Sequence, residues 1–243
     1  MYLTPGRTPA QAIIEDFRLG MDHVKIVNSG VNSLSEFGKE TSPQFTVDEL
    51  RSAVKAAESI GLNVMVHANG KEPVRIAIEA GCHTVEHGFF MGKENLKRMA
   101  DMGTVWVPTI CTMKAYMENS DPESDGYQVA QKNLTHQLEQ VEKATGYGAT
   151  IALGTDAGSP GVYHGLAVID ELRLLALAGL SVEQALKCAT SNAMQTINDP
   201  GNTGILSDGM PATFVAVNGR PADLPESLGN IRGIWVRGKR KQP

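Results

Sequence analysis

Five short apolar runs of the sequence each end on a polar side chain that could bind a metal ion or contact a substrate. The runs are His23–Asn28, Asn63–His67, Thr84–His87, Val105–Thr109 and Ile151–Asp156. Helical patterns fill the intervals, and strand–helix alternation of this kind implies a parallel sheet. In a barrel of alternating strands and helices, the carboxyl ends of the strands form the active-site face. We therefore expect four side chains to converge there: Lys25, His67, His87 and Asp156.

His67 and His87 carry the strongest local signal for a metal site. Each ends a run rich in β-branched residues, and the chain turns immediately afterwards at Ala68-Asn69-Gly70 and at Gly88. Neutral imidazole is the commonest protein ligand of zinc and similar ions. The alternative is that each is a hydrogen-bonded histidine of the core or its rim. With a second histidine at an equivalent strand end and an aspartate at a third, the two interpretations carry equal weight.

Asp156 lies among small residues in Gly154-Thr155-Asp156-Ala157-Gly158 at the end of the fifth run. A carboxylate there can bind a metal ion and transfer a proton. A helix N-cap or an Asx turn is the alternative, because aspartate is common in both. His164 follows the Gly158–Gly161 loop and is a candidate substrate contact, with exposure to water as its alternative.

Lys25 stands inside the first run, where a lysine is ordinarily an edge residue that extends its amine to water. On a buried inner strand the amine would lose its proton readily. A neutral amine can take up carbon dioxide and become a carbamate, an anionic ligand that can bridge two metal ions. Glu86 should point away from His87, and we expect it to pack between its strand and a helix.

Composition restricts the class of protein. The 243 residues carry 22 basic and 27 acidic side chains, a net charge of −5, which argues against partners such as nucleic acid or an anionic membrane. No apolar stretch approaches the roughly 20 residues that span a bilayer. Residues 1–7 lack the features of a secretion signal. Three widely spaced cysteines favour reduced thiols. The sequence thus predicts a cytoplasmic α/β protein.

The pattern along the chain divides it near residue 200. Before this point we expect one partial barrel domain, 1–200, with predicted helices at 9–20, 47–60, 73–80, 93–102, 127–145, 166–178 and 182–192. After it, short strands at 213–217 and 231–236 predict a β-rich segment, 201–243. Loops at 29–43 and 120–126 are rich in polar and turn-forming residues. Only five strands precede residue 200, whereas a closed barrel of this type needs eight.

Four motifs, in this order, resemble the amidohydrolase superfamily. They are Val24-Lys25-Ile26, Val66-His67-Ala68-Asn69-Gly70, Val85-Glu86-His87-Gly88 and Gly154-Thr155-Asp156-Ala157-Gly158. The nearest likeness is to the imidazolonepropionase-like and prolidase-like (Xaa-Pro/Xaa-Arg dipeptidase) branch. Residues 204–212 and 234–239 are similar to the strands with which that branch returns to its β-sandwich. The resemblance covers nearly the whole chain.

The resemblance implies a TIM-type (β/α)8 barrel that is incomplete, with strands four to eight present and a small C-terminal β-sandwich remnant. Lys25 would be the carboxylated lysine of strand four, His67 and His87 the ligands from strands five and six, and Asp156 the ligand and general base or acid of strand eight. One or two Zn²⁺ ions would polarise a carbonyl, and metal-bound hydroxide would attack it. The expected reaction is hydrolysis of amide, peptide or cyclic-amide C–N bonds in a small-molecule or dipeptide-like substrate.

Two features depart from the family pattern. The His-x-His pair of the first strand is absent, and Ala212-Thr213 stands where the family usually has Ala-Asp. The first departure implies that one metal position is crippled, while the position formed by carboxylated Lys25, His67 and His87 persists.

An isolated five-stranded sheet would also expose apolar edges. We therefore expect a homo-oligomer or a partner chain that supplies the missing strands. The alternatives are a catalytically inactive remnant or subunit and, ranked last, a metal-free enzyme that binds phosphate at residues 154–161.

Overall fold

The main sheet of the protein contains four parallel strands. The computed structural model describes residues 6–17, 21–197 and 203–241. The sheet order β1-β2-β3-β4 follows the chain order, with β1 at His23–Val27, β2 at Asn63–Ala68, β3 at Thr84–His87 and β4 at Val105–Val107. A helix connects each strand to the next, so the predicted strand–helix alternation is confirmed for these four strands.

The register of the sheet gives it two different faces. Val66 aligns with Val85, and Val85 with Trp106, and all three side chains are buried beneath the helices. Because side chains alternate along a strand, Lys25, His67 and Glu86 belong to the opposite face. We call this second face the inner face. It is partly open to solvent, since Val27 on it is 54% exposed.

Eight α-helices accompany the strands in the described part of the chain: α1 Pro9–Asp16, α2 Val47–Glu58, α3 Lys71–Glu79, α4 Lys93–Met102, α5 Cys111–Glu118, α6 Asp125–Gly146, α7 Leu166–Leu177 and α8 Val182–Cys188. Thr46 and Ser181 begin α2 and α8 with capping boxes, and both helices start where the sequence predicts, at residues 47 and 182. The predicted end of α1 at Gly20 lies outside the described residues.

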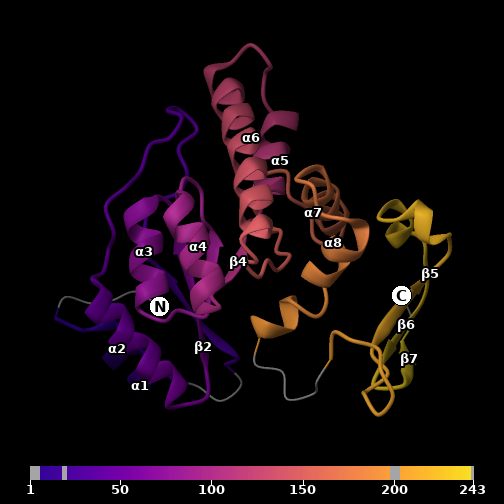
Figure 1. Ribbon diagram of the computed structural model, residues 1–243, viewed down its shortest axis with the longest axis horizontal. Helices are drawn as coiled ribbons and strands as arrows, with labels where there is room; N and C mark the ends of the chain where they lie inside the picture. Colours follow the sequence, from indigo (N-terminus) through magenta and orange to yellow (C-terminus); the bar gives the residue numbers. More distant parts are fainter. Residues whose placement is uncertain (1–5, 18–20, 198–202, 242–243) are drawn as a thin grey trace.

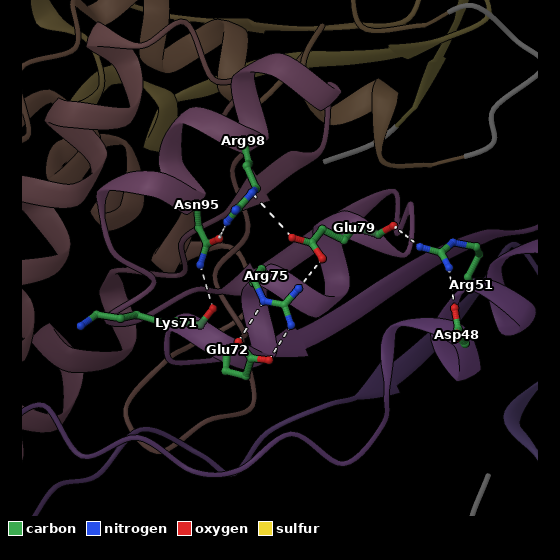
Figure 2. Close-up of polar contacts among 8 residues, drawn as sticks. All are labelled: Asp48, Arg51, Lys71, Glu72, Arg75, Glu79, Asn95 and Arg98. Carbon is green, nitrogen blue, oxygen red and sulfur yellow. Dashed lines mark hydrogen bonds and ion pairs between the residues drawn. The ribbon is translucent and has the colours of Figure 1, made fainter.

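Helices α2, α3 and α4 are tied together on the outer surface (Figure 1). Glu79 of α3 forms an ion pair with Arg75 of the same helix and another with Arg98 of α4, whose closest nitrogen lies 3.7 Å from its carboxylate. Arg51 of α2 donates a hydrogen bond to the backbone oxygen of Glu79 at 3.1 Å (Figure 2). Exposed pairs of this kind contribute about 0.2–1 kcal/mol each, so the network fixes the helices relative to one another more than it stabilises the fold.

The fifth predicted strand, Ile151–Asp156, does not form. Its contact with the sheet is one parallel bridge between Ile151 and Trp106. Ala152 still donates to the backbone oxygen of Trp106 at 2.8 Å, but Leu153 donates to Cys188 at the end of α8 instead. The neighbouring strand, β4, has three residues and offers few backbone partners. The segment therefore leaves the sheet at Leu153, whose N–H bonds to the backbone oxygen of Cys188.

Helix α5 was not predicted, because its start has no local signal. Its N-cap is Ile110, which makes no side-chain capping bond. Instead the buried carboxylate of Glu171 on α7 accepts hydrogen bonds from the backbone N–H groups of Ile110 and Cys111 at 2.9 and 2.7 Å. A residue sixty positions away thus does the work of the missing cap.

The C-terminal part forms a separate antiparallel sheet in the order β5-β6-β7: β5 Phe214–Val217, β6 Ile231–Val236 and β7 Lys239–Lys241. The rings of Phe214 and Trp235 stack across it with centroids 4.8 Å apart. Arg173 of α7 connects this part to the helices by an ion pair with Glu226 at 3.0 Å. No helix in the described ranges is both long enough and apolar enough to cross a membrane.

The buried face of the sheet should dominate stability. Leu50 of α2 is fully buried in the main core. We expect Leu50→Ala to lower the free energy of unfolding by about 2–5 kcal/mol, because the cavity it leaves adds to the lost transfer energy. Leu177→Ala is the control, since Leu177 is 70% exposed. Chemical denaturation measures both, and equal losses for the two variants would contradict this assignment of the core.

Candidate functional site

The structure brings His67 and His87 together at the ends of β2 and β3. Their ring centroids lie 4.5 Å apart, with the ring planes at 64°. His67 points to the inner face as a regular strand residue. His87 ends β3 with a backbone φ of 67°, a left-handed conformation that breaks the alternation of the strand. Strand alternation alone would place the side chains of His67 and His87 on opposite faces of the sheet. Because of this turn, they become neighbours.

Left-handed backbone recurs at this edge of the sheet. Thr109, just beyond β4, has φ 47°, and Asp156 has φ 54°. Such values are uncommon for residues other than glycine and cost of the order of 1–3 kcal/mol each. Strain of this kind concentrates at functional sites, where the surrounding structure holds it in place. Three of the five predicted strand ends carry it here.

Hydrogen bonds orient both imidazoles. Nδ1 of His87 lies 2.8 Å from the hydroxyl oxygen of Thr109. Nε2 of His67 lies 3.1 Å from the backbone oxygen of Gly30, which also accepts from the Asn69 amide at 3.3 Å. Because a carbonyl oxygen only accepts, the contact with Gly30 favours a proton on Nε2 of His67 and a lone pair on Nδ1.

Burial keeps the two histidines neutral. It lowers the pKa of His67, and the nearby charge of Lys25 lowers it further. Burial also lowers the pKa of His87 to about 3, helped by repulsion from His67 and Lys25. At neutral pH both rings therefore have the uncharged form that a metal ligand requires.

Lys25 and Glu86 form an ion pair on the inner face, with Nζ 3.8 Å from the nearer carboxylate oxygen. The Thr84 hydroxyl donates a hydrogen bond to Glu86. Partial burial lowers the pKa of Lys25, against the attraction of Glu86 and Asp156. Burial raises the pKa of Glu86, while Lys25 opposes this shift.

The expectation that Glu86 packs between strand and helix is wrong. The register places Glu86 level with His67, on the face away from the helices. Sequence reasoning therefore missed Glu86 as a site residue. Strand alternation places Thr84 and Glu86 on the same face of the sheet. That this is also the face of His67 follows only once the register with β2 is known.

Asp156 lies close enough for its charge to raise the pKa values of Lys25 and His67. Its carboxylate also accepts a hydrogen bond from the Ser159 hydroxyl at 2.8 Å, a side-chain contact that differs from the backbone N–H contact of an Asx turn or N-cap. His164 is exposed. Within the described ranges, no hydrogen bond or ion pair joins His164 to the other four candidates.

A complete metal site is not evident from the conventional ligands alone. Among residues 6–17, 21–197 and 203–241, no group of three or more histidine, cysteine, aspartate or glutamate side chains is arranged to hold a metal ion. Two neighbouring imidazoles are in place. A third ligand would have to come from a modified Lys25 or from a shift of the Asp156 carboxylate.

Comparison with known sequences identifies relatives that are longer than this chain. Ochratoxinase of Aspergillus niger is 26% identical over 235 residues, which cover 94% of this chain and 48% of that protein. Imidazolonepropionase of Syntrophobacter fumaroxidans is 26% identical over 196 residues, 76% of this chain and 40% of that protein. The chain spans about half the length of the curated relatives it matches.

Solved structures of the same kind superpose on the fold. A Xaa-Pro dipeptidase with methionine bound in its active site is 29% identical, with a TM-score of 0.79 over 99% of this chain and 62% of that one. Crystalline A. niger ochratoxinase is 26% identical, with a TM-score of 0.81 over 96% of this chain and 53% of that one. The model of the amidohydrolase family matches residues 7–242. The resemblance seen in the sequence is confirmed, and the chain belongs to the amidohydrolase family.

Proposed function

We propose that this chain carries part of a metal-dependent hydrolase site that cleaves amide, peptide or cyclic-amide C–N bonds. The observation that carries the proposal is the pair of neutral imidazoles, His67 and His87, with ring centroids 4.5 Å apart at the ends of neighbouring parallel strands. Membership of a family that is typically metal-dependent supports it. In this proposal the parallel sheet is the later part of a (β/α)8 barrel, with residues 1–200 as barrel and 201–243 as sandwich.

The residues present fit a divalent cation such as Zn²⁺ if Lys25 is carboxylated. His67 and His87 would supply two nitrogen ligands, carboxylated Lys25 an oxygen ligand, and Asp156 a further carboxylate. His67, His87 and carboxylated Lys25 by themselves would give the three protein ligands with an open position that are typical of catalytic zinc. The ion would supply Lewis acidity toward a carbonyl and acidify water.

The chain's own groups have distinct proposed roles. Thr109 and Gly30 hold the two imidazoles in position. Glu86 holds the Lys25 amine on the inner face, and partial burial favours the neutral amine that carboxylation needs. Asp156 would take a proton from the attacking water and return it to the leaving amine. His164, exposed on the segment beyond Asp156, would contact a small or dipeptide-like substrate.

Zinc binding tests the proposal directly. Chain freed of metal and then incubated with Zn²⁺ and bicarbonate should retain zinc through dialysis, and His67→Ala with His87→Ala should abolish retention because both nitrogen ligands are lost. His164→Ala is the matched control and should retain zinc. Elemental analysis provides the measurement.

After zinc loading, Asp156→Asn should hydrolyse N-acyl amino acids and dipeptides about 10²–10⁴-fold more slowly than the wild type. Well-folded wild-type chain that retains no zinc would contradict the site. Zinc retention without turnover would favour the inactive-subunit alternative.

The lowered pKa of His87 predicts a pH-dependent stability. The unfolded ring titrates near pH 6.5 and the folded ring near 3, so unfolding takes up a proton between these values. The contribution of the neutral ring is complete above about pH 6.5 and is lost as the pH falls, by about 1.4 kcal/mol per pH unit. Between pH 7 and 5, the wild type should lose about 2 kcal/mol more than His87→Gln.

Denaturant titrations at several pH values measure this difference. Other titrating groups, including Glu86, contribute to both proteins and cancel in the comparison. His164→Gln should keep the wild-type pH dependence, because that side chain is exposed. A His87→Gln variant with the wild-type slope would show that the folded ring is not held neutral.

We further propose that a second chain, another copy or a different polypeptide, covers the inner face. β1 is an edge strand, and Val27 on the inner face is 54% exposed. Exposed strand edges and apolar side chains favour association. Light scattering after size exclusion should show an oligomer that Val27→Lys weakens and that Leu177→Lys, at an exposed position of α7, does not. A wild-type chain that remains monomeric as its concentration rises would exclude self-association.

A further inference from the structure

Helix α6 carries a stripe of buried amides. Asn133 and Gln137 are completely buried and Gln140 nearly so. Spacings of four and three residues place them on one side of the helix. A buried amide costs free energy unless it is hydrogen-bonded, so the partners of these side chains indicate what they do.

Gln137 joins the ends of two strands. Its Nε2 donates to the backbone oxygen of His87 at 2.6 Å and to that of Pro108 at 3.1 Å. Gln140 orients it, because Nε2 of Gln140 donates to Oε1 of Gln137 at 2.8 Å and to the backbone oxygen of Gly88 at 3.2 Å. One side-chain amide therefore contacts the end of β3 and the residue after β4 together.

The carbonyls of His87 and Pro108 lie at the left-handed turns that orient the side chains of His87 and Thr109. φ is 67° at His87, 65° at Gly88 and 47° at Thr109. A Cβ on Gly88 would lie 2.6 Å from Nε1 of Trp106, and that nitrogen donates to the His87 carbonyl at 3.0 Å. The turn at His87 is thus enclosed by side-chain donors and has little room to relax.

We propose that Gln137 is a positioning residue for His87. By holding the carbonyls of His87 and Pro108, it fixes the turn before Gly88 relative to the turn at Thr109. It thereby sets the 2.8 Å contact between the His87 ring and the Thr109 hydroxyl, and with it the direction of the imidazole. Gln140 acts through Gln137. The consequence for metal affinity rests on the proposed function, whereas the effect on the ring does not.

Asn133 provides a matched control for the loss of a buried amide. It lies in the same stripe of α6, but its Nδ2 donates to the backbone oxygen of Ser33 at 3.0 Å, in the loop after β1. If Gln137 matters only for stability, Gln137→Met and Asn133→Leu should behave alike. If Gln137 positions His87, the two variants should differ at the histidine ring.

The experiment compares the ring nitrogens of His87 in full-length chain labelled with ¹⁵N-histidine, by NMR at neutral pH without metal. The wild type should show a single set of His87 ring signals, because the ring has one orientation. Gln137→Met should shift or split the His87 signals, and Asn133→Leu should leave them unchanged. Unchanged His87 signals in Gln137→Met, or equal changes in both variants, would overturn the proposal.

A zinc competition titration forms the second arm. Gln137→Met should weaken Zn²⁺ binding about 10–100-fold, the range found for residues that orient a ligand, and Asn133→Leu should not weaken it. If the wild type binds no Zn²⁺, the proposed function fails while the NMR arm still decides the positioning role. If Gln137→Met does not fold, Gln140→Met decides: it should change the His87 signals in the same direction, and unchanged signals would overturn the proposal.

Discussion

The candidate site depends on buried polar side chains that hold strand ends in conformations the strands would not adopt alone. Gln137 of α6 holds the turn at His87, and Glu171 of α7 accepts from the two backbone N–H groups that follow Thr109. Cys111 continues the chain of contacts by donating to the backbone oxygen of Thr155, next to Asp156. At about 1–3 kcal/mol for each left-handed residue, these turns need such partners to persist. Helices α5, α6 and α7 are therefore part of the site although they contribute no candidate ligand.

Electrostatics on the inner face follow from the same enclosure. Burial acts on His67, His87 and Lys25 in one direction, lowering the pKa of each because the charged form is poorly solvated. It raises the pKa of Glu86 for the same reason. All four shifts favour uncharged groups. Neutral imidazoles are the form that can bind a cation, and a lowered pKa of the Lys25 amine is the direction that uptake of carbon dioxide would need.

Local sequence signals predicted the elements that depend on local physics. The apolar runs predicted β1 to β4, and the predicted helix starts at residues 47 and 182 match α2 and α8, which begin with capping boxes. Where a contact between residues distant in the chain determines the local structure, the sequence pattern did not predict that structure. Helix α5 begins because of Glu171, sixty residues away, and Leu153 leaves the sheet because Cys188 accepts its N–H.

The site divides in the same way. The pairing of His67 with His87 was predicted from equivalent strand ends, although the left-handed turn that achieves it was not. The position of Glu86 required the register between β2 and β3. The amides of α6 looked like ordinary polar residues of an amphipathic helix, since only the fold shows that they face strand ends and not water.

The inner face carries both polar and apolar side chains, and this mixture explains how a face that is partly exposed to water can also carry the proposed metal site. A sheet face built only from valine and leucine would be driven to collapse or aggregate when left open to water. Here charged or polar side chains, among them Lys25, His67 and Glu86, alternate across neighbouring strands with apolar ones such as Val27 and Met65. The side chains suited to bind a cation are thus also the ones that let an uncovered face remain hydrated. A partner that covers this face must satisfy those polar groups, which favours a polar, water-containing interface over a second hydrophobic core.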